Sequence, residues 1–186
     1  MKFKLNPLFF LVLLVFSFFG FFSRVLLAFL FVFLHECTHI ITAKKLGYEI
    51  YKIELFPFGG VAEYLGMVEM RPLHEVIIAL SGPVFNFLMA AIFFIIPYQV
   101  NCFSVVIELN LLIGFFNLLP ALPLDGGRIL RAFFVLSFGF ERGTKIALFI
   151  ARIAAFSSAI ISIIFLLYNN SNLWLLLLSF FIYGAL

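Results

Sequence analysis

Charged side chains are scarce in this chain. Only 11% of its 186 residues are charged and 65% are hydrophobic, whereas ordinary globular domains carry about 25% charged residues. This shortage excludes a soluble domain of ordinary composition and predicts a polytopic membrane protein, too short to add a sizeable soluble domain. The formal net charge is only +3 and there is no basic run, so we expect no nucleic-acid partner.

Cysteine is also scarce, since the chain has only Cys37 and Cys102, and this number does not predict a disulfide framework. A small-residue cleavage site is lacking after the first apolar run, residues 5–22. More apolar segments follow at once, so we expect this run to be a retained membrane helix and not a signal peptide.

Long apolar segments, in contrast, are plentiful, and they predict an all-α membrane protein with about six transmembrane helices in a single domain, residues 1–186. The expected spans cover about 5–22, 24–44, 73–97, 103–119, 145–168 and 173–186. The last run would be about 21 Å long as a helix, shorter than a bilayer core of about 30 Å. It therefore indicates either an incomplete sixth span or a truncated chain. A short helix near the membrane surface is expected over Ile129–Phe140.

The one long polar interruption, Leu46–Arg71, has the pattern of a membrane-associated β-hairpin between the second and third helices. Residues 48–55 are rich in strand formers, Pro57-Phe58-Gly59-Gly60 indicates a turn, and residues 61–64 could pair back. This hairpin could offer a strand edge to an extended peptide. It could equally be a plain hairpin at the membrane surface.

Positive charges predict the orientation of the chain. With six spans, both termini share one side of the membrane, and the other side holds only Arg24. The rich side holds Lys2, Lys4, Lys44, Lys45, Lys52, Arg71, Arg128, Arg131, Arg142 and Lys145. The positive-inside rule makes that side cytoplasmic, together with the N-terminus.

The second helix ends in the sequence His35-Glu36-Cys37-Thr38-His39. Side chains four residues apart lie on one face of a helix, so both histidines can bind one metal ion, with Glu36 beside them as a general base. The preceding ten residues have no polar side chain, and polar residues at membrane depth usually have a function. His39 lies about 8 Å from the Lys44-Lys45 end of the helix, which predicts a metal site inside the membrane near its cytoplasmic face.

A catalytic zinc ion takes three protein ligands, so a third must come from elsewhere in the chain. Asp125 is our prediction, because it is the acidic residue in a loop, residues 117–128, that is interrupted by two prolines and two glycines. Irregular backbone at membrane depth usually lines a cavity. The alternative is an ordinary turn aspartate before Gly126-Gly127. Cys37 is rotated about 200° from each histidine, which favours a packing role over a ligand role.

The motif His35–His39 on an apolar helix, followed later in the chain by the stretch Asn117–Gly127, resembles the site-2 protease family of intramembrane zinc metalloproteases. The resemblance extends over about residues 34–131. More specifically, four stretches resemble the stage IV sporulation protein FB branch of that family. These stretches are Leu55–Gly60, Arg71–Leu73, Ser81–Pro83 and Asn117–Arg128. We expect neither an inserted PDZ domain nor the C-terminal cystathionine-β-synthase-type domain of many branch members within residues 1–186.

The resemblance implies that His35, His39 and Asp125 bind Zn²⁺ and that Glu36 is the catalytic base. It also implies that Asn117 and Pro123 contact the substrate or the transition state. Asn86 would be an active-site neighbour by resemblance, or else would form an interhelical hydrogen bond.

The branch implies a substrate as well: the membrane-associated precursor of the sigma-K factor, held in check by inhibitory membrane proteins in the mother-cell membrane around the forespore. Three alternatives stay open, namely another regulated protease of this type with a different substrate, a polytopic metal-binding or transport protein, and an inactive scaffold.

Overall fold

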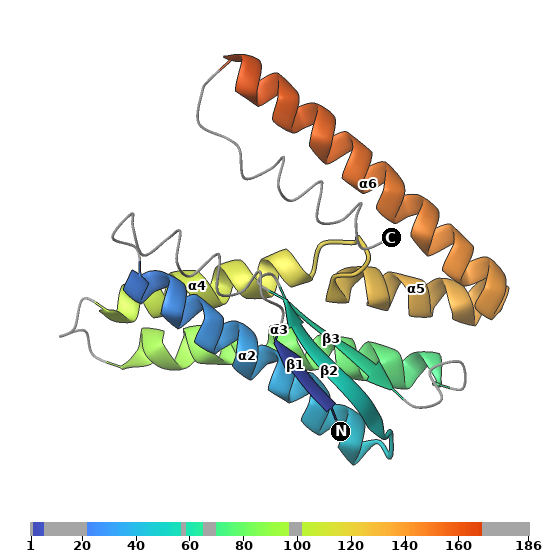
Figure 1. The fold of residues 1–186 in the computed structure, drawn as a ribbon, viewed down its shortest axis with the longest axis horizontal. Helices are drawn as coiled ribbons and strands as arrows, with labels where there is room; N and C mark the ends of the chain where they lie inside the picture. The colour runs from blue at the N-terminus through green and yellow to red at the C-terminus, as the bar shows by residue number, and fades with distance from the viewer. Residues whose placement is uncertain (1, 6–21, 57–58, 65–69, 97–101, 169–186) are drawn as a thin grey trace. The chain divides into compact units, whose positions relative to one another are not determined.

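A computed structural model describes residues 2–5, 22–56, 59–64, 70–96 and 102–168 (Figure 1). The described helices and strands, in chain order, are β1 (Lys2–Leu5), α2 (Phe22–Lys45), β2 (Ile50–Phe56), β3 (Gly59–Tyr64), α3 (Pro72–Ile95), α4 (Cys102–Asn117), α5 (Asp125–Phe138) and α6 (Phe140–Tyr168). The chain forms two compact units, and the boundary between them lies between Phe116 and Asn117.

In the first unit, α2 and α3 lie side by side, with His35 and His39 on α2 and Asn86 on α3. Proline at the first position of α3 fits there because that position needs no N–H donor. Gly47, with φ of +87°, allows the chain to turn just after α2 ends. The fully buried pair Ala43 and Ile78 closes the contact between the two helices near this end.

Helix α4 joins this unit through an apolar cluster. Phe31 of α2 packs with Val106 and Ile113 of α4, and partly buried side chains of α2 and α3 surround them. A Cβ atom at Gly114 would lie 2.9 Å from the Phe87 ring, so glycine there allows α4 to approach α3 closely. The core of the first unit is therefore a three-helix contact.

The sheet has the order β1-β2-β3 (Figure 1). Strands β2 and β3 pair antiparallel, with Ile53 opposite Ala62, and β1 pairs parallel to β2, with Phe3 opposite Ile53. Strand β2 thus lies in the centre, and β3 lies against α2. Sequence reasoning missed β1, because Lys2 and Lys4 were interpreted only as charges before an apolar helix that begins at Leu5. The remainder of that expected helix, residues 6–21, lies outside the described residues.

In the second unit, α5 begins at Asp125, so it includes both glycines and starts before the predicted Ile129. The prediction that Gly126 and Gly127 belong to an irregular loop was wrong. Cβ atoms there would collide with backbone atoms of Leu118 and Leu122, so the glycines let the first helical turn fold close against the preceding loop. Gly139, with φ of +80°, separates α5 from α6.

Helices α5 and α6 pack against each other. A stripe of small buried residues on α6, four positions apart, favours this close approach. The stripe is formed by Ala147, Ala151 and Ala155, of which Ala155 packs against Ala121 in the loop before α5. Helix α6 begins at Phe140, five residues before the predicted Lys145.

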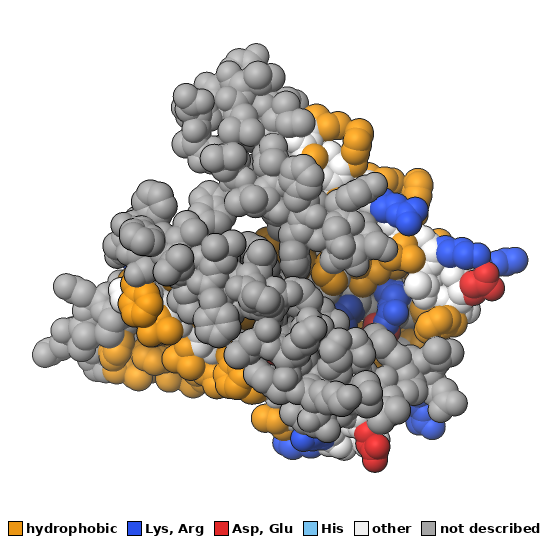
Figure 2. Space-filling view, viewed as in Figure 1, with side chains coloured by type: hydrophobic (Ala, Val, Ile, Leu, Met, Phe, Trp, Pro, Cys, Tyr) orange, Lys and Arg blue, Asp and Glu red, His pale blue; other side chains and the backbone are white. Residues whose placement is uncertain are grey.

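Three described helices are long and apolar enough to cross a membrane: α2, α3 and the part of α6 over residues 140–161. Helix α4 is apolar but shorter. Hydrophobic side chains are widely exposed on these helices, and in Figure 2 they gather along the end of α3 at the lower left. Such surfaces suit lipid contact, and the chain is an integral membrane protein. The expected last span, residues 173–186, lies outside the described residues.

Candidate metal centre

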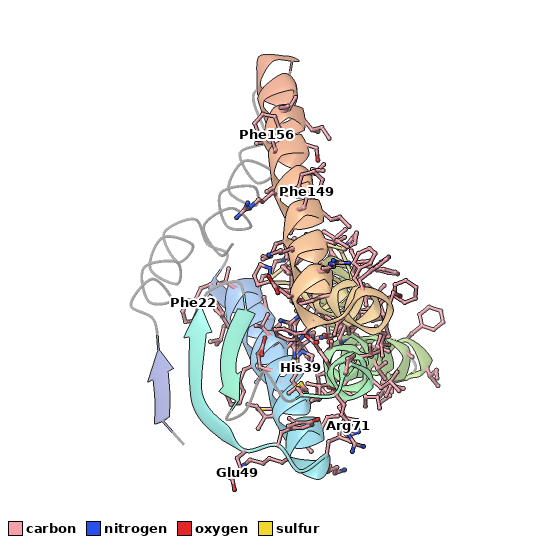
Figure 3. All side chains as sticks on the ribbon, turned by 90° about the vertical axis from the view of Figure 1, so that its right-hand side faces the viewer. Phe22, His39, Glu49, Arg71, Phe149 and Phe156 are labelled. Atoms are coloured by element: carbon pink, nitrogen blue, oxygen red, sulfur yellow. The ribbon has the colours of Figure 1, made fainter. Side chains whose placement is uncertain are left out.

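His35 and His39 lie one turn apart on α2 and point the same way, as predicted from their spacing. Their side chains are 1% and 3% exposed, and their Nε2 atoms are 3.0 Å apart. Figure 3 labels His39 on the side of α2 that contacts α3. The two imidazoles thus converge on one buried point.

The other ring nitrogens of the histidines are held by α3. His35 Nδ1 donates to Asn86 Oδ1 at 2.5 Å, and His39 Nδ1 donates to the Ile78 carbonyl at 2.6 Å. Ser81 Oγ also donates to that carbonyl, at 2.6 Å, and lies 3.2 Å from His39 Nδ1. A neutral imidazole with its proton on Nδ1 carries a lone pair on Nε2. Each histidine therefore presents a ligand atom to the shared point.

This arrangement fits a zinc ion. Two lone pairs with their nitrogen atoms 3.0 Å apart repel each other, and a cation between them turns that repulsion into attraction. Nitrogens bound to one tetrahedral zinc at about 2.0–2.1 Å lie about 3.3 Å apart, close to the observed separation. Ligand histidines also usually donate their second nitrogen to a carbonyl or similar acceptor, as both do here.

Gly82 completes the wall of this site, and sequence reasoning named it only as part of the Ser81–Pro83 resemblance. A Cβ atom at this position would lie 2.5 Å from His35 Cε1 and Nε2, and 2.6 Å from His39 Cε1. Only glycine therefore leaves room for both imidazole rings against α3. The adjacent Pro83 has no N–H group, so the helix loses one internal hydrogen bond at this depth.

We expect Gly82→Ala to weaken zinc binding by about 10-fold or more, because the added methyl group displaces both ligands. Zinc affinity of the purified protein in detergent is the measurement. Gly114→Ala is the matched control, since it strains a helix contact against Phe87 instead of the histidines. Equal zinc affinity of Gly82→Ala and wild type would show that the rings do not need this space.

The three residues between the ligands differ in their roles. Glu36 is half-buried on α2 directly after His35. The Thr38 hydroxyl donates to the His35 carbonyl at 2.7 Å, so it is engaged with its own helix. Cys37 is a half-buried free thiol.

His74, near the beginning of α3, contacts the segment that follows α2. Its Nδ1 atom lies 2.8 Å from the Tyr48 hydroxyl, which also accepts a hydrogen bond from the Arg71 N–H. This contact ties the segment after α2 to the beginning of α3.

In the second unit, Asp125 is the first residue of α5 and is 5% exposed. Arg128, one turn later, donates from Nη1 to Asp125 Oδ1 at 3.3 Å. A carboxylate held by a cation in this way has a fixed orientation. Asn117 is the last residue of α4, and Pro123 lies in the loop before α5.

The chain is similar to known proteins over most of its length. The model of peptidase family M50 matches residues 23–107 and 98–161. Zinc metalloprotease MJ0392 of Methanocaldococcus jannaschii is 39% identical over 85% of this chain, and stage IV sporulation protein FB of Bacillus subtilis is 32% identical over 69%. The chain spans 46% of the length of each of these relatives.

The solved structure of the site-2 protease from M. jannaschii superposes with a TM-score of 0.79 at 32% identity. The match covers 98% of this chain and 88% of that one. The resemblance stated from the motifs is thereby confirmed. Zinc is the metal that the donor set fits and that the relative's name states. This chain belongs to peptidase family M50, the site-2 protease family.

Proposed function

We propose that this chain is an intramembrane zinc metalloendopeptidase that hydrolyses a peptide bond of a membrane-associated protein. The observation that carries the proposal is the convergence of two buried Nε2 atoms on an apolar helix, with a glutamate directly after the first histidine. A site that only stores or transports a metal has no need of a general base beside its ligands. Family membership supports the same activity.

Asp125 is the third zinc ligand in this proposal. Its carboxylate is buried, lies at the beginning of a helix and is oriented by Arg128. A carboxylate and two imidazoles are a donor set of catalytic zinc sites, with one position left for water. We therefore assign Zn²⁺ to His35, His39 and Asp125.

Zinc bound there would supply Lewis acidity, by acidifying water and polarising a carbonyl oxygen. Glu36 takes a proton from the attacking water and gives it to the nitrogen of the departing amine. Asn117 and Pro123, which flank the loop before Asp125, contact the substrate backbone near the scissile bond.

Cleavage takes place near the cytoplasmic face, with the N-terminus in the cytoplasm. Lys44 and Lys45 form the last turn of α2, less than two turns after His39. The distribution of lysine and arginine along the chain supports this orientation in the bilayer.

The substrate binds as an added strand on β3. Strand β2 has a neighbour on each side, whereas β3 has a described neighbour on one side only and lies against α2, the helix that bears the histidines. A peptide must be extended to be cut, and strand addition supplies that conformation through backbone hydrogen bonds.

Proline substitutions test this docking mode. In an antiparallel pair, successive residues turn their N–H groups alternately to the partner strand and away from it. Val61→Pro and Ala62→Pro are therefore both made. One of them removes an N–H donor from the open edge of β3 and leaves the hydrogen bonds between β3 and β2 intact. We expect that variant to lose cleavage about 10-fold or more with zinc affinity unchanged. Phe3→Pro in β1 is the control, and equal losses from both strands would contradict docking on β3.

The substrate that the resemblance to the sporulation branch favours is the sigma-K precursor, processed in the mother-cell membrane and restrained by inhibitory membrane partners. Similarity to stage IV sporulation protein FB supports this choice. Another membrane-bound precursor is the alternative. Co-expression of the chain with each precursor, scored for a change in precursor size, decides between them. Absence of any cleaved product from all precursors would overturn the protease proposal.

A further inference from the structure

We propose that Asn110 of α4 is a positioning residue of the metal centre, acting through Asn86 on the tautomer of His35. The inference rests on the proposed zinc site. A chain of hydrogen bonds carries it. His35 Nδ1 donates to Asn86 Oδ1, Asn86 Nδ2 donates to Asn110 Oδ1 at 2.8 Å, and Asn110 Nδ2 donates to the Val106 carbonyl at 2.9 Å.

The direction of this chain is fixed from its far end. The Val106 carbonyl can only accept, so Asn110 must turn its NH₂ group toward it and its oxygen toward Asn86. Asn86 must then turn its own NH₂ group toward Asn110, which leaves its oxygen facing His35. His35 must therefore carry its proton on Nδ1, and its Nε2 lone pair faces the metal position.

The setting makes each link necessary. Asn86 and Asn110 are both 0% exposed, and Asn110 lies on α4 between Val106 and Ile113, which pack with Phe31 of α2 in an apolar cluster. A buried amide without a hydrogen-bond partner is costly, and neighbouring bonds polarise one another. Helix α4 thus contributes to the metal centre through Asn110, which supports a ligand histidine and does not itself bind the metal.

The same contacts define the role of Asn86. Both polar atoms of its amide are engaged, one by His35 and the other by Asn110. We assign Asn86 to holding His35 instead of contacting the substrate. His39 has a simpler anchor, because its Nδ1 acceptor is the backbone carbonyl of Ile78. The two ligands differ in that only His35 depends on amide orientation.

Replacing Asn110 by leucine removes the acceptor that orients Asn86. The Asn86 amide can then rotate and offer its NH₂ group to His35 Nδ1, which moves the imidazole proton to Nε2. An imidazole protonated at Nε2 cannot bind zinc through that atom. We expect Asn110→Leu to lower zinc affinity by about 10–100-fold, the usual effect of removing a partner of a ligand histidine.

The experiment uses the full chain in detergent, with ¹⁵N-labelled histidine and no metal. The chain has only three histidines, and His74, bonded to Tyr48, is an internal reference. Wild type should show His35 protonated on Nδ1, and Asn110→Leu should show a population protonated on Nε2. Zinc affinity of the same samples is the second readout. An unchanged His35 tautomer with unchanged zinc affinity would overturn the proposal.

Two further comparisons separate positioning from packing. Ile113→Ala weakens the same helix contact and keeps both amide side chains, so it should leave both readouts unchanged. Asn110→Leu should have little further effect on zinc affinity once Asn86→Leu is present, because both act through His35. Additive losses, or an equal loss from Ile113→Ala, would overturn the proposal. If the leucine variant does not fold, Asn110→Ser, with a hydroxyl too short to reach Asn86, takes its place with the same expected outcomes.

Failure of this inference is distinguishable from failure of the proposed function. A wild-type chain that binds no zinc contradicts the proposed function, and the tautomer of His35 in the metal-free protein still decides the role of Asn110. A wild-type chain that binds zinc, with Asn110→Leu equal to it in both readouts, contradicts the positioning role alone.

Discussion

We expect Glu36→Gln to abolish peptide-bond cleavage while zinc remains bound. The amide is nearly the size of the carboxylate, so α2 and the two histidines keep their places, but an amide cannot take a proton from water. General acid–base catalysis contributes about 10²–10⁴-fold to such reactions. We expect the cleavage rate of a membrane-bound substrate to fall by at least that range, measured with purified chain at saturating zinc.

Glu49→Gln is the control for this change. Glu49 is an exposed glutamate of the same unit, in the segment between α2 and β2, and Figure 3 shows it away from His39. Its substitution should leave cleavage unaltered. Full cleavage by Glu36→Gln would show that Glu36 is not the general base and would contradict its proposed role.

We expect Asp125→Asn to cause the second large loss, of both zinc and activity. The substitution keeps the size of the side chain and removes the negative charge that would face the cation. Removal of a residue that binds the metal directly should lower zinc affinity by more than the approximately 10–100-fold that is lost when a hydrogen-bond partner of a ligand is removed. We therefore expect zinc affinity to fall more than about 100-fold, measured by competition with a chelator, and cleavage to be lost at any limiting zinc concentration.

Glu141→Gln controls for loss of an acidic group from the second unit. Glu141 is exposed and pairs with Lys145 at 2.6 Å on α6, and such surface pairs contribute little. Its zinc affinity should equal that of wild type. Wild-type zinc affinity in Asp125→Asn would show that the third ligand lies elsewhere.

The histidine pair was predictable because helical spacing alone brings residues four apart to one face. The helix that carries it was also predictable, since ten apolar residues precede His35 and two lysines follow at its end. Local pattern thus sufficed for α2. The family followed from the same local stretches, because each motif lies within a single loop or helix.

Other features depended on contacts between elements that are distant in the sequence. Nothing local indicates that Gly82 leaves space for imidazole rings of another helix, or that Asn110 orients Asn86. The start of α5 was misplaced because paired glycines usually break helices, whereas here Gly126 and Gly127 permit a close backbone approach within the first turn. Strand β1 was missed because its pairing partner is β2, far along the chain.

X-ray absorption at the zinc edge of the zinc-loaded wild-type chain identifies the atoms that bind the metal. We expect one zinc per chain, with two imidazole nitrogens at about 2.0–2.1 Å and oxygen donors in the remaining positions. Sulfur at about 2.3 Å would instead make Cys37 or Cys102 a ligand, and a single imidazole would separate His35 from His39. Either result would contradict a zinc centre built from His35, His39 and Asp125.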